Sequence, residues 1–408
     1  MRPPLLMVLG AGPWQLPVIR RAKALGVRVL AVDRDADRPG YREAQACAQA
    51  DLYDVEALTR LAREHRVDGV LAPTSDVGVA SAAAVAEALG LPGIGRAAAL
   101  ACTDKSALAQ TLRRAPQGGR DSLCLWPDQE PACDWTAWPV VVKPVDAQSG
   151  RGVRIVQQAD ALPAALAHAR AHSRSGRVLL DPWIPGVEHI ADVFVWQGRI
   201  TFLGLCRKTA DPTNPTVAAE LNYLAGAEFC ALAEQVEPVL RTWLELIGLR
   251  QGICHLEFIL NGTGLWPIDC AARGGGAMIY THVLPAVSGV DAVAASIQAA
   301  LGRTPDLRTG ARQAVCVAFA RTDAGWLRGV QGLERLPRLP GVLGWHVAAK
   351  VGDRLGVAVD KDARPAWVVA GAPELEVARQ RAQAALRALN WEIQSQPPIP
   401  QGACDAIL

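Results

Sequence analysis

The sequence of 408 residues lacks the features that would tie it to a membrane or to nucleic acid. No apolar run approaches the roughly 20 residues that a membrane-spanning helix needs. The strand-like run after the first four residues follows no small-residue cleavage site, so we expect no signal peptide. The net charge of +2 gives no strong attraction for a polyanion. We therefore expect a cytoplasmic protein with neither a membrane nor a nucleic-acid partner.

The cysteines lack a metal-binding pattern. All ten are scattered, none forms a C-x-x-C pair, and no cluster of histidine and cysteine has the spacing of a zinc site. A reduced protein is the simplest interpretation. Cys270 lies beside Asp269, but strand alternation directs the thiol to the opposite face, which predicts a core residue rather than a nucleophile.

Lysine is scarce, with six lysines against 36 arginines. Because arginine fills most positions where a surface cation suffices, a remaining lysine indicates a need for a compact ammonium group. Lys143 ends an apolar strand, where a lysine is costly unless it meets an anion. Lys105 lies in the first turn of an expected helix capped by Thr103, where the helix dipole disfavours a cation. Both positions therefore predict anion binding.

Chain length and hydrophobic periodicity predict an α/β protein of several domains. Apolar strands and helices alternate over about the first 90 residues, which favours a parallel, Rossmann-like sheet. Residues 207–226 show no clear period and are expected to form a loop. The expected parts are a Rossmann-like domain, a helix with a linker, a small lid module, an antiparallel core and a C-terminal β-rich lobe (residues 1–95, 96–138, 139–184, 185–310 and 311–408).

The most informative stretch begins at His255 and reads as two strands around an Asn-Gly turn. With a loop at 262–264, residue 260 pairs with 266, and Glu257 faces Asp269. Opposed carboxylates repel each other, unless a hard cation lies between them. The pattern therefore predicts a site for Mg²⁺ or Mn²⁺. Arg273 follows shortly after, and two acids and an arginine around a metal suit phosphoryl transfer.

Glycine-rich segments add candidate anion sites. The loop 146–152 after Lys143 contains Gly150 and Gly152, and its backbone amides could hold phosphate oxygens, although a plain hairpin turn is the alternative. Glycines 274–276 leave the backbone open to a carboxylate or a phosphate, or form a flexible turn.

Three acids near strand ends have two interpretations each. Asp181 and Glu188 could bind the ribose or the adenine of a nucleotide, or be solvated residues of a hinge. Asp33 closes the strand after Gly10-Ala11-Gly12, as in a dinucleotide site. Because the third glycine of that fingerprint is Gln15, a structural turn is the more economical interpretation.

The order of these motifs resembles the ATP-grasp superfamily of carboxylate–amine ligases over nearly the whole chain. It is closest to the bacterial L-amino-acid (dipeptide) ligases and more distantly similar to biotin carboxylase and the purine-pathway members. The resemblance rests on T-D-K, V-V-V-K-P, G-R-G-V, G-V-E, H-x-E-F and I-D-x-x-A-R-G-G-G. It implies an ATP-grasp fold, ATP and magnesium as cofactors, and a homodimer.

The resemblance also implies roles for individual residues. The phosphates would be held by Lys105 and by the catalytic Lys143 and covered by the loop with Ser149, Gly150, Gly152 and Val153. The adenosine would lie beside Asp181, Trp183, Ile184 and Glu188. Glu257 and Asp269 would bind magnesium, and the catalytic Arg273 would hold the acyl phosphate, with Gly275, Gly276, Glu220 and His282 on the substrate side. The family more often has Glu at position 269, and many members have a metal-binding Asn at position 271, where this chain has Ala271.

The implied activity is an ATP-dependent ligase that joins a small-molecule carboxylate to an amine. Amino-acid-like substrates would react through an acyl phosphate, releasing ADP and phosphate. His282, Glu220 and Tyr280 are candidates for the general base. Three alternatives stay open: a ligase of formate or bicarbonate, a nicotinamide-dependent oxidoreductase based on Gly10, Gly12 and Asp33, and a non-catalytic nucleotide sensor.

Overall fold

The computed structural model describes residues 2–131, 138–310 and 312–396. Part of the expected linker, 132–137, and two cysteines, Cys133 and Cys404, therefore lie outside the described residues. The chain divides into two compact units: Met1–Arg207 with Leu224–Arg312, and Lys208–Tyr223 with Gln313–Leu408. The second unit thus contains a short internal segment in addition to the C-terminal one.

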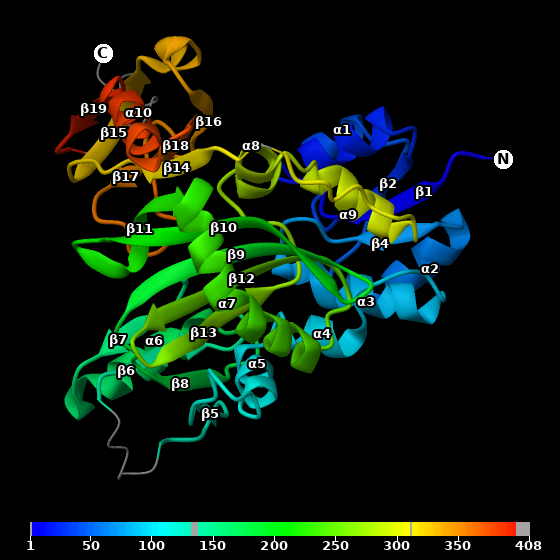
Figure 1. The fold of residues 1–408 in the computed structure, drawn as a ribbon, viewed down its shortest axis with the longest axis horizontal. Helices are drawn as coiled ribbons and strands as arrows, with labels where there is room; N and C mark the ends of the chain where they lie inside the picture. The colour runs from blue at the N-terminus through cyan, green and yellow to red at the C-terminus, as the bar shows by residue number, and fades with distance from the viewer. Residues whose placement is uncertain (1, 132–137, 311, 397–408) are drawn as a thin grey trace, which may run out of the picture. The chain divides into compact units, whose positions relative to one another are not determined.

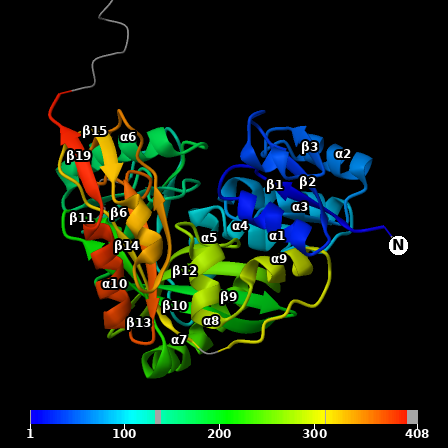
Figure 2. The ribbon, with the colours of Figure 1, turned by 90° about the horizontal axis from the view of Figure 1, so that it is seen from above.

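The first unit begins with a parallel four-stranded sheet, as the alternation of strands and helices predicts (Figures 1 and 2). Its order is β3-β2-β1-β4. The apolar runs of β1 and β2 are buried almost throughout, as expected for strands covered on both faces. The sequence did not predict β3, a short edge strand whose residues are only partly buried. The elements are β1 (Leu5–Leu9), α1 (Leu16–Ala24), β2 (Arg28–Asp33), β3 (Ala46–Gln49), α2 (Val55–His65), β4 (Gly69–Leu71) and α3 (Val79–Ala88).

A small antiparallel sheet with one helix follows in the chain. Its strand order is β5-β8-β6-β7, and α6 packs on it through a core that includes Val140, Val142, Leu166 and Leu180. Helices α4 (Arg96–Ala101) and α5 (Lys105–Leu112) precede this module. Its elements are β5 (Leu123–Leu125), β6 (Val140–Pro144), β7 (Arg154–Val156), α6 (Leu162–His172) and β8 (Val178–Pro182).

The core of the first unit is an antiparallel sheet in the order β13-β12-β9-β10. Cys254, Leu256 and Phe258 on β12 are buried, and the Phe258 ring packs edge-on against Trp243 of helix α7. His255 and Glu257 therefore project from the opposite face of β12, because side chains alternate along a strand. The elements are β9 (Val187–Trp196), β10 (Arg199–Asp211), α7 (Gly226–Ile247), β12 (Gln251–Asn261), β13 (Gly264–Ala271), a π-helical turn (Ile279–Val283), α8 (Leu284–Ser288) and α9 (Ala292–Ala300).

The second unit is rich in strands, as predicted. Strands β11 (Asn214–Tyr223), β14 (Ala314–Phe319), β18 (Ala366–Ala372) and β16 (Val342–Val347) are neighbours in that order, and α10 (Leu375–Arg387) packs on β14 and β18. A smaller sheet has the order β17-β15-β19 (Arg354–Leu355, Gly325–Gln331 and Asn390–Gln394).

The prediction of a loop at 207–226 is wrong, because most of this segment forms the end of β10 and all of β11. Its polar side chains obscure the period in the sequence, but tertiary contacts satisfy them. Glu220 accepts hydrogen bonds from Arg379 and Gln383 of α10, and Asn222 donates to Thr209.

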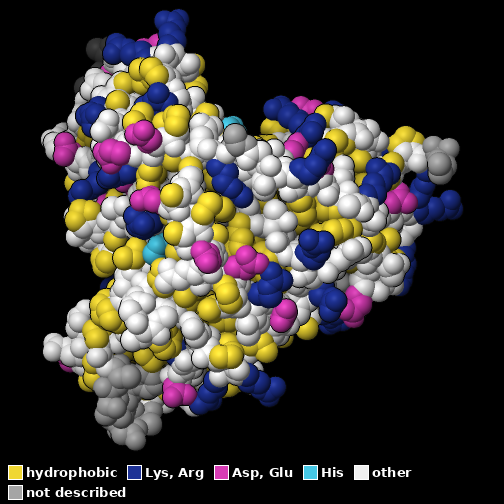
Figure 3. All heavy atoms as spheres, in the orientation of Figure 1, with side chains coloured by type: hydrophobic (Ala, Val, Ile, Leu, Met, Phe, Trp, Pro, Cys, Tyr) yellow, Lys and Arg dark blue, Asp and Glu magenta, His cyan; other side chains and the backbone are white. Residues whose placement is uncertain are grey.

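Among the described residues, no single helix has both the length and the hydropathy of a membrane span, although Ile279–Ser288 and Ala292–Ala300 pass that test together as a bent pair. Basic and acidic side chains are intermixed on the face that Figure 3 shows, in keeping with the small net charge.

Candidate active site

The β12–β13 hairpin places the two predicted metal carboxylates opposite each other. Glu257 pairs with Asp269, and their side chains are 12 % and 32 % exposed. The turn is tighter than predicted, because Leu260 pairs with Leu265 rather than with Trp266. A bulge at Ile268 on β13, opposite the step from Glu257 to Phe258, compensates for the shorter turn, so that Glu257 still faces Asp269.

The two carboxylates suit a magnesium ion that is also bound by phosphate. Oxygen is the donor that Mg²⁺ prefers, and nucleotide sites commonly use one or two carboxylates together with substrate phosphates. Within residues 2–131, 138–310 and 312–396, no group of three or more His, Cys, Asp or Glu side chains is placed to hold a metal. Ala271, opposite His255 in the ladder, offers no donor atom. The donor set thus fits an ion that arrives with its phosphate ligands.

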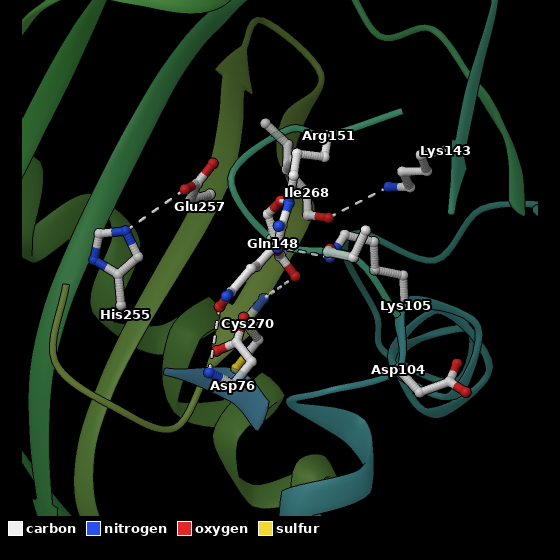
Figure 4. Close-up of polar contacts among 12 residues, drawn as sticks. Asp76, Asp104, Lys105, Lys143, Gln148, Arg151, His255, Glu257, Ile268 and Cys270 are labelled. Carbon is white, nitrogen blue, oxygen red and sulfur yellow. Dashed lines mark hydrogen bonds and ion pairs between the residues drawn. The ribbon is translucent and has the colours of Figure 1, made fainter. Parts of the chain in front are cut away.

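A buried histidine lies beside the first carboxylate (Figure 4). His255 Nδ1 is 2.7 Å from Asp192 on β9, and its Nε2 is 3.5 Å from Glu257. Burial by itself would lower the pKa of His255, but the neighbouring Asp192 and then Glu257 raise it to about 9. His255 was not among the predicted site residues, although a residue two positions before Glu257 on a strand must share its face.

Lys105 reaches the second carboxylate. Its Nζ atom lies 3.1 Å from Asp269 and 3.1 Å from the carbonyl of Ala147 in the glycine loop. The residue that caps this helix is Asp104, whose carboxylate accepts hydrogen bonds from the backbone amides of Ser106 and Ala107. The predicted cap, Thr103, instead donates its hydroxyl to the carbonyl of Ala99. Burial opposes the charge of Lys105, but Asp269 outweighs burial and raises its pKa. The ammonium group of Lys105 is therefore held beside the two carboxylates that are predicted to bind the metal.

Lys143 is buried in the lid sheet against an acid. Its Nζ atom lies 2.5 Å from Asp181 on β8. The same atom lies 3.4 Å from the carbonyl of Ile268 on β13 (Figure 4). Arg120 also contacts Asp181, at 3.3 Å. Burial lowers the pKa of Lys143, and the attraction of Asp181 opposes that effect only in part. Arg120 lies in the segment predicted to be a linker, and no local pattern marks it.

The glycine loop adopts a backbone that other residues rarely take. Ser149, Gly150 and Gly152 have φ values of 63°, 73° and 75°, in the left-handed region. A side chain at Gly152 would also meet His172 and Pro144 at 2.7 Å. Gln148 accepts a hydrogen bond from the backbone amide of Asp76, so the loop reaches the N-terminal domain (Figure 4).

Arg273 is held by Asp76, an acid that was not among the predicted site residues. Its Nε and Nη2 atoms donate to the carboxylate of Asp76, at 2.6 and 3.3 Å. Burial by itself would raise the pKa of Asp76, but Arg273 outweighs it and holds that pKa below its ordinary value. The only available signal was the position of Asp76 soon after a parallel strand, where the functional residues of such sheets gather.

The glycines after Arg273 allow a close approach of neighbouring groups. A side chain at Gly274 would overlap the ring of Tyr280 at 2.3 Å, and one at Gly275 would press on Ile279 at 3.0 Å and on His255 at 3.2 Å. Space is open only at Gly276. The first two glycines are therefore required by packing around the site.

The remaining residues predicted for the site have different surroundings. Trp183 is 41 % exposed, and it follows Asp181 together with the half-buried Ile184. Glu188 is half-buried on β9, opposite Ile259. His282 Nδ1 lies 2.8 Å from the hydroxyl of Thr281, and burial lowers its pKa. Glu220 belongs to the second unit, where α10 engages its carboxylate.

The glycine loop of the N-terminal domain is occupied by its own side chains. Asp33 accepts a hydrogen bond from the amide of Ala11, and the Gln15 side chain packs on Gly10 and Gly12 within 3.0–3.3 Å of where their side chains would be. These contacts favour the structural-turn interpretation over a dinucleotide site.

Comparisons with known proteins identify the fold and the family. Family models match for an ATP-grasp N-terminal domain (residues 19–93), an ATP-grasp domain (136–282) and the C-terminal domain 2 of L-amino acid ligases (318–394). The L-amino acid ligase from Bacillus licheniformis has a similar fold, with a TM-score of 0.80 over 97 % of this chain and 100 % of that one, at 18 % identity.

Two curated proteins that are similar to this chain are formyltransferases rather than L-amino acid ligases. The formate-dependent phosphoribosylglycinamide formyltransferase of Synechococcus sp. (strain CC9605) is 32 % identical over 45 % of this chain, a match that spans about half of that relative (48 %). The same enzyme of Parasynechococcus marenigrum (strain WH8102) is 28 % identical over 88 % of this chain and 92 % of its own.

The chain belongs to the ATP-grasp superfamily of ATP-dependent ligases, as the motifs predicted. Enzymes of this superfamily use ATP and Mg²⁺. Residues 318–394 of this chain are similar to the C-terminal domain 2 of L-amino acid ligases.

Proposed function

We propose that the protein activates a small carboxylate with ATP and transfers the acyl group to an amine. The observation that carries the proposal is the convergence of five side chains from α5, β6 and the β12–β13 hairpin with the residues that follow it: Lys105, Lys143, Glu257, Asp269 and Arg273. Two lysines and an arginine to neutralise phosphate charge, with two carboxylates to bind a metal, make up the charge arrangement that phosphoryl transfer requires.

The first step would be attack by a carboxylate oxygen on the γ-phosphorus of ATP. The bond from that phosphorus to the β-γ bridging oxygen breaks, and ADP leaves. Lys143 and Arg273 would neutralise charge on the transferred group, and Lys105 would hold the phosphates beside Asp269. Magnesium on Glu257 and Asp269 would add charge neutralisation.

The second step would be attack by an amine on the acyl carbon. The carbon–oxygen bond to phosphate breaks, an amide forms, and the amine loses a proton. The glycine loop 146–152 would cover the acyl phosphate against hydrolysis. His282 stays a candidate base, because burial favours its neutral form, which can accept a proton.

The nature of the carboxylate has two candidates. The curated relatives support formate better than the predicted amino acid. Both relatives described above are formate-dependent enzymes, and one of them matches over 92 % of its length. The C-terminal domain favours an amino acid. A cytoplasmic location and a homodimer stay predictions.

The test is to incubate the protein with ATP, Mg²⁺ and pools of carboxylates and amines, and to analyse the products by mass spectrometry. We expect ADP and a new amide. Release of AMP would contradict the acyl phosphate, binding of ATP without turnover would indicate a sensor, and oxidation of NADH without ATP would indicate an oxidoreductase.

A further inference from the structure

A cavity of about 70 Å³ lies beside the proposed carboxylate site, within the first unit. Its walls come from β4 and α3 of the N-terminal domain and from β12 and α9 of the core. The aliphatic side chains among them include Leu71, Val79, Ala83, Ile253 and Ala299.

The cavity shares residues with the site that holds Arg273. Its lining continues through Pro73 and Arg273 itself. The amide of Gly274 donates to the carbonyl of Pro73 at 2.9 Å, and Asp76, three residues farther on, holds the Arg273 guanidinium group. A molecule whose carboxylate is held by Arg273 can therefore have the rest of its structure next to this space.

The size and the lining of the cavity define the group that fits it. One water molecule needs about 10–15 Å³ of such space, so the cavity accepts a group of several heavy atoms. The aliphatic walls offer water few hydrogen bonds, which favours a hydrocarbon group. Formate carries no carbon beyond its carboxylate and would leave the cavity empty.

The wall also contains polar side chains, namely Gln251, Tyr280 and Ser296 in addition to Arg273. Tyr280 lines the cavity and is 1 % exposed. Within the described residues its hydroxyl makes no hydrogen bond of good geometry, although the Ser296 hydroxyl is near enough to interact with it. The nearby Ser296 donates its own hydroxyl to the carbonyl of Ala292 at 2.9 Å. A buried hydroxyl left in this state is uncommon in a simple packing void, and it suits a ligand with one polar group beside its hydrocarbon part.

We propose that this cavity receives the aliphatic side chain of the carboxylate substrate, of the size of a valine or leucine side chain. This inference rests on the proposed ligase function and names the substrate class within it. The protein would then select an aliphatic amino acid over formate and glycine.

The test uses hydroxylamine as the amine, since it traps an acyl phosphate as a hydroxamate whatever the natural amine is. We would measure kcat/KM for formate, glycine, alanine, valine, leucine and phenylalanine. Leucine should exceed glycine by about 100-fold or more, because each methylene group in an apolar pocket contributes roughly tenfold or more.

Two variants fill the cavity from opposite walls, Ala83→Leu on α3 and Ala299→Leu on α9. Each should reduce the ratio of leucine to glycine activity by at least about tenfold. Ala88→Leu, on an exposed position of the same helix as Ala83, is the matched control and should keep the ratio. Thermal unfolding of each variant reports whether it folds.

Several outcomes would overturn the proposal. Formate as good a substrate as leucine would do so, as would fill variants that fold and keep the wild-type ratio. If no carboxylate yields hydroxamate, the ligase function fails. Calorimetric titration with leucine then tests the cavity alone: binding to the wild type that is lost in both fill variants supports it, and no binding to the wild type refutes it.

Discussion

Asp76 controls the position of the arginine on which the proposed chemistry depends, so Asp76→Asn is the most direct test of the site. The substitution keeps the shape of the side chain but removes its charge. Arg273 would lose the carboxylate that accepts from its Nε and Nη2 atoms at 2.6 and 3.3 Å. Because Asp76 does not itself meet the reacting atoms in this scheme, it is a positioning residue.

The magnitude follows from the burial of the pair. The side chains of Arg273 and Asp76 are 14 % and 22 % exposed. Removing one partner of a buried ion pair costs about 3–5 kcal/mol. Partial exposure places this pair at the lower end, about 3 kcal/mol. The released guanidinium group would turn toward Asp269 and Glu257, whose charges already act on it. A displacement of about 1 Å at such a group lowers the rate roughly 100-fold.

The assay compares urea unfolding with ADP release for the wild type, Asp76→Asn and Asp306→Asn. Asp306 also binds an arginine through two hydrogen bonds, but both partners are exposed, so its loss should change neither property measurably. An Asp76→Asn protein with wild-type stability and wild-type turnover would refute the role of the pair. Loss of stability with unchanged turnover would leave Asp76 a purely structural residue.

Other predictions concern the same site. Lys143→Met should weaken ATP binding by at least about tenfold in calorimetry, whereas Lys350→Met, on the exposed surface of the second unit, should not. Arg273→Ala should lower kcat by about 10²–10³-fold in the hydroxamate assay, and near-full activity would exclude it from the reaction. Lys143 and Arg120 hold the pKa of Asp181 below its ordinary value against the opposing effect of burial, so their attraction stabilises the fold above about pH 3.9 and is lost as the pH falls through the lowered pKa. Asp181→Asn should therefore destabilise the protein near neutrality and make its acid unfolding less steep, and an identical pH profile would contradict the assignment.

Local periodicity predicted most of the elements that carry the site. The parallel strands of the N-terminal domain, the lid strand ending at Lys143 and the facing pair Glu257–Asp269 all agree with the structure. The strand β11 was missed because its polar residues conceal the alternation, and they find their hydrogen-bond partners on helix α10 and on Thr209 of β10. Where a residue's role depends on a partner far along the chain, a single sequence contains no pattern that reveals it.

What the sequence determined by itself is the inventory of chemistry: two scarce lysines, two acids on one face of a hairpin, and glycines where the backbone must turn. These follow from the two-residue repeat of a strand and from the conformational limits of side chains, which act over a few residues. Only the tertiary structure decided how the groups are held. Asp76 meets Arg273 across 197 residues, and Asp192 meets His255 across 63. The first pair joins segments that follow strands of two different sheets, and the second joins the neighbouring strands β9 and β12 of one sheet. Both form because packing excludes water, so that each buried charge must find its counterion.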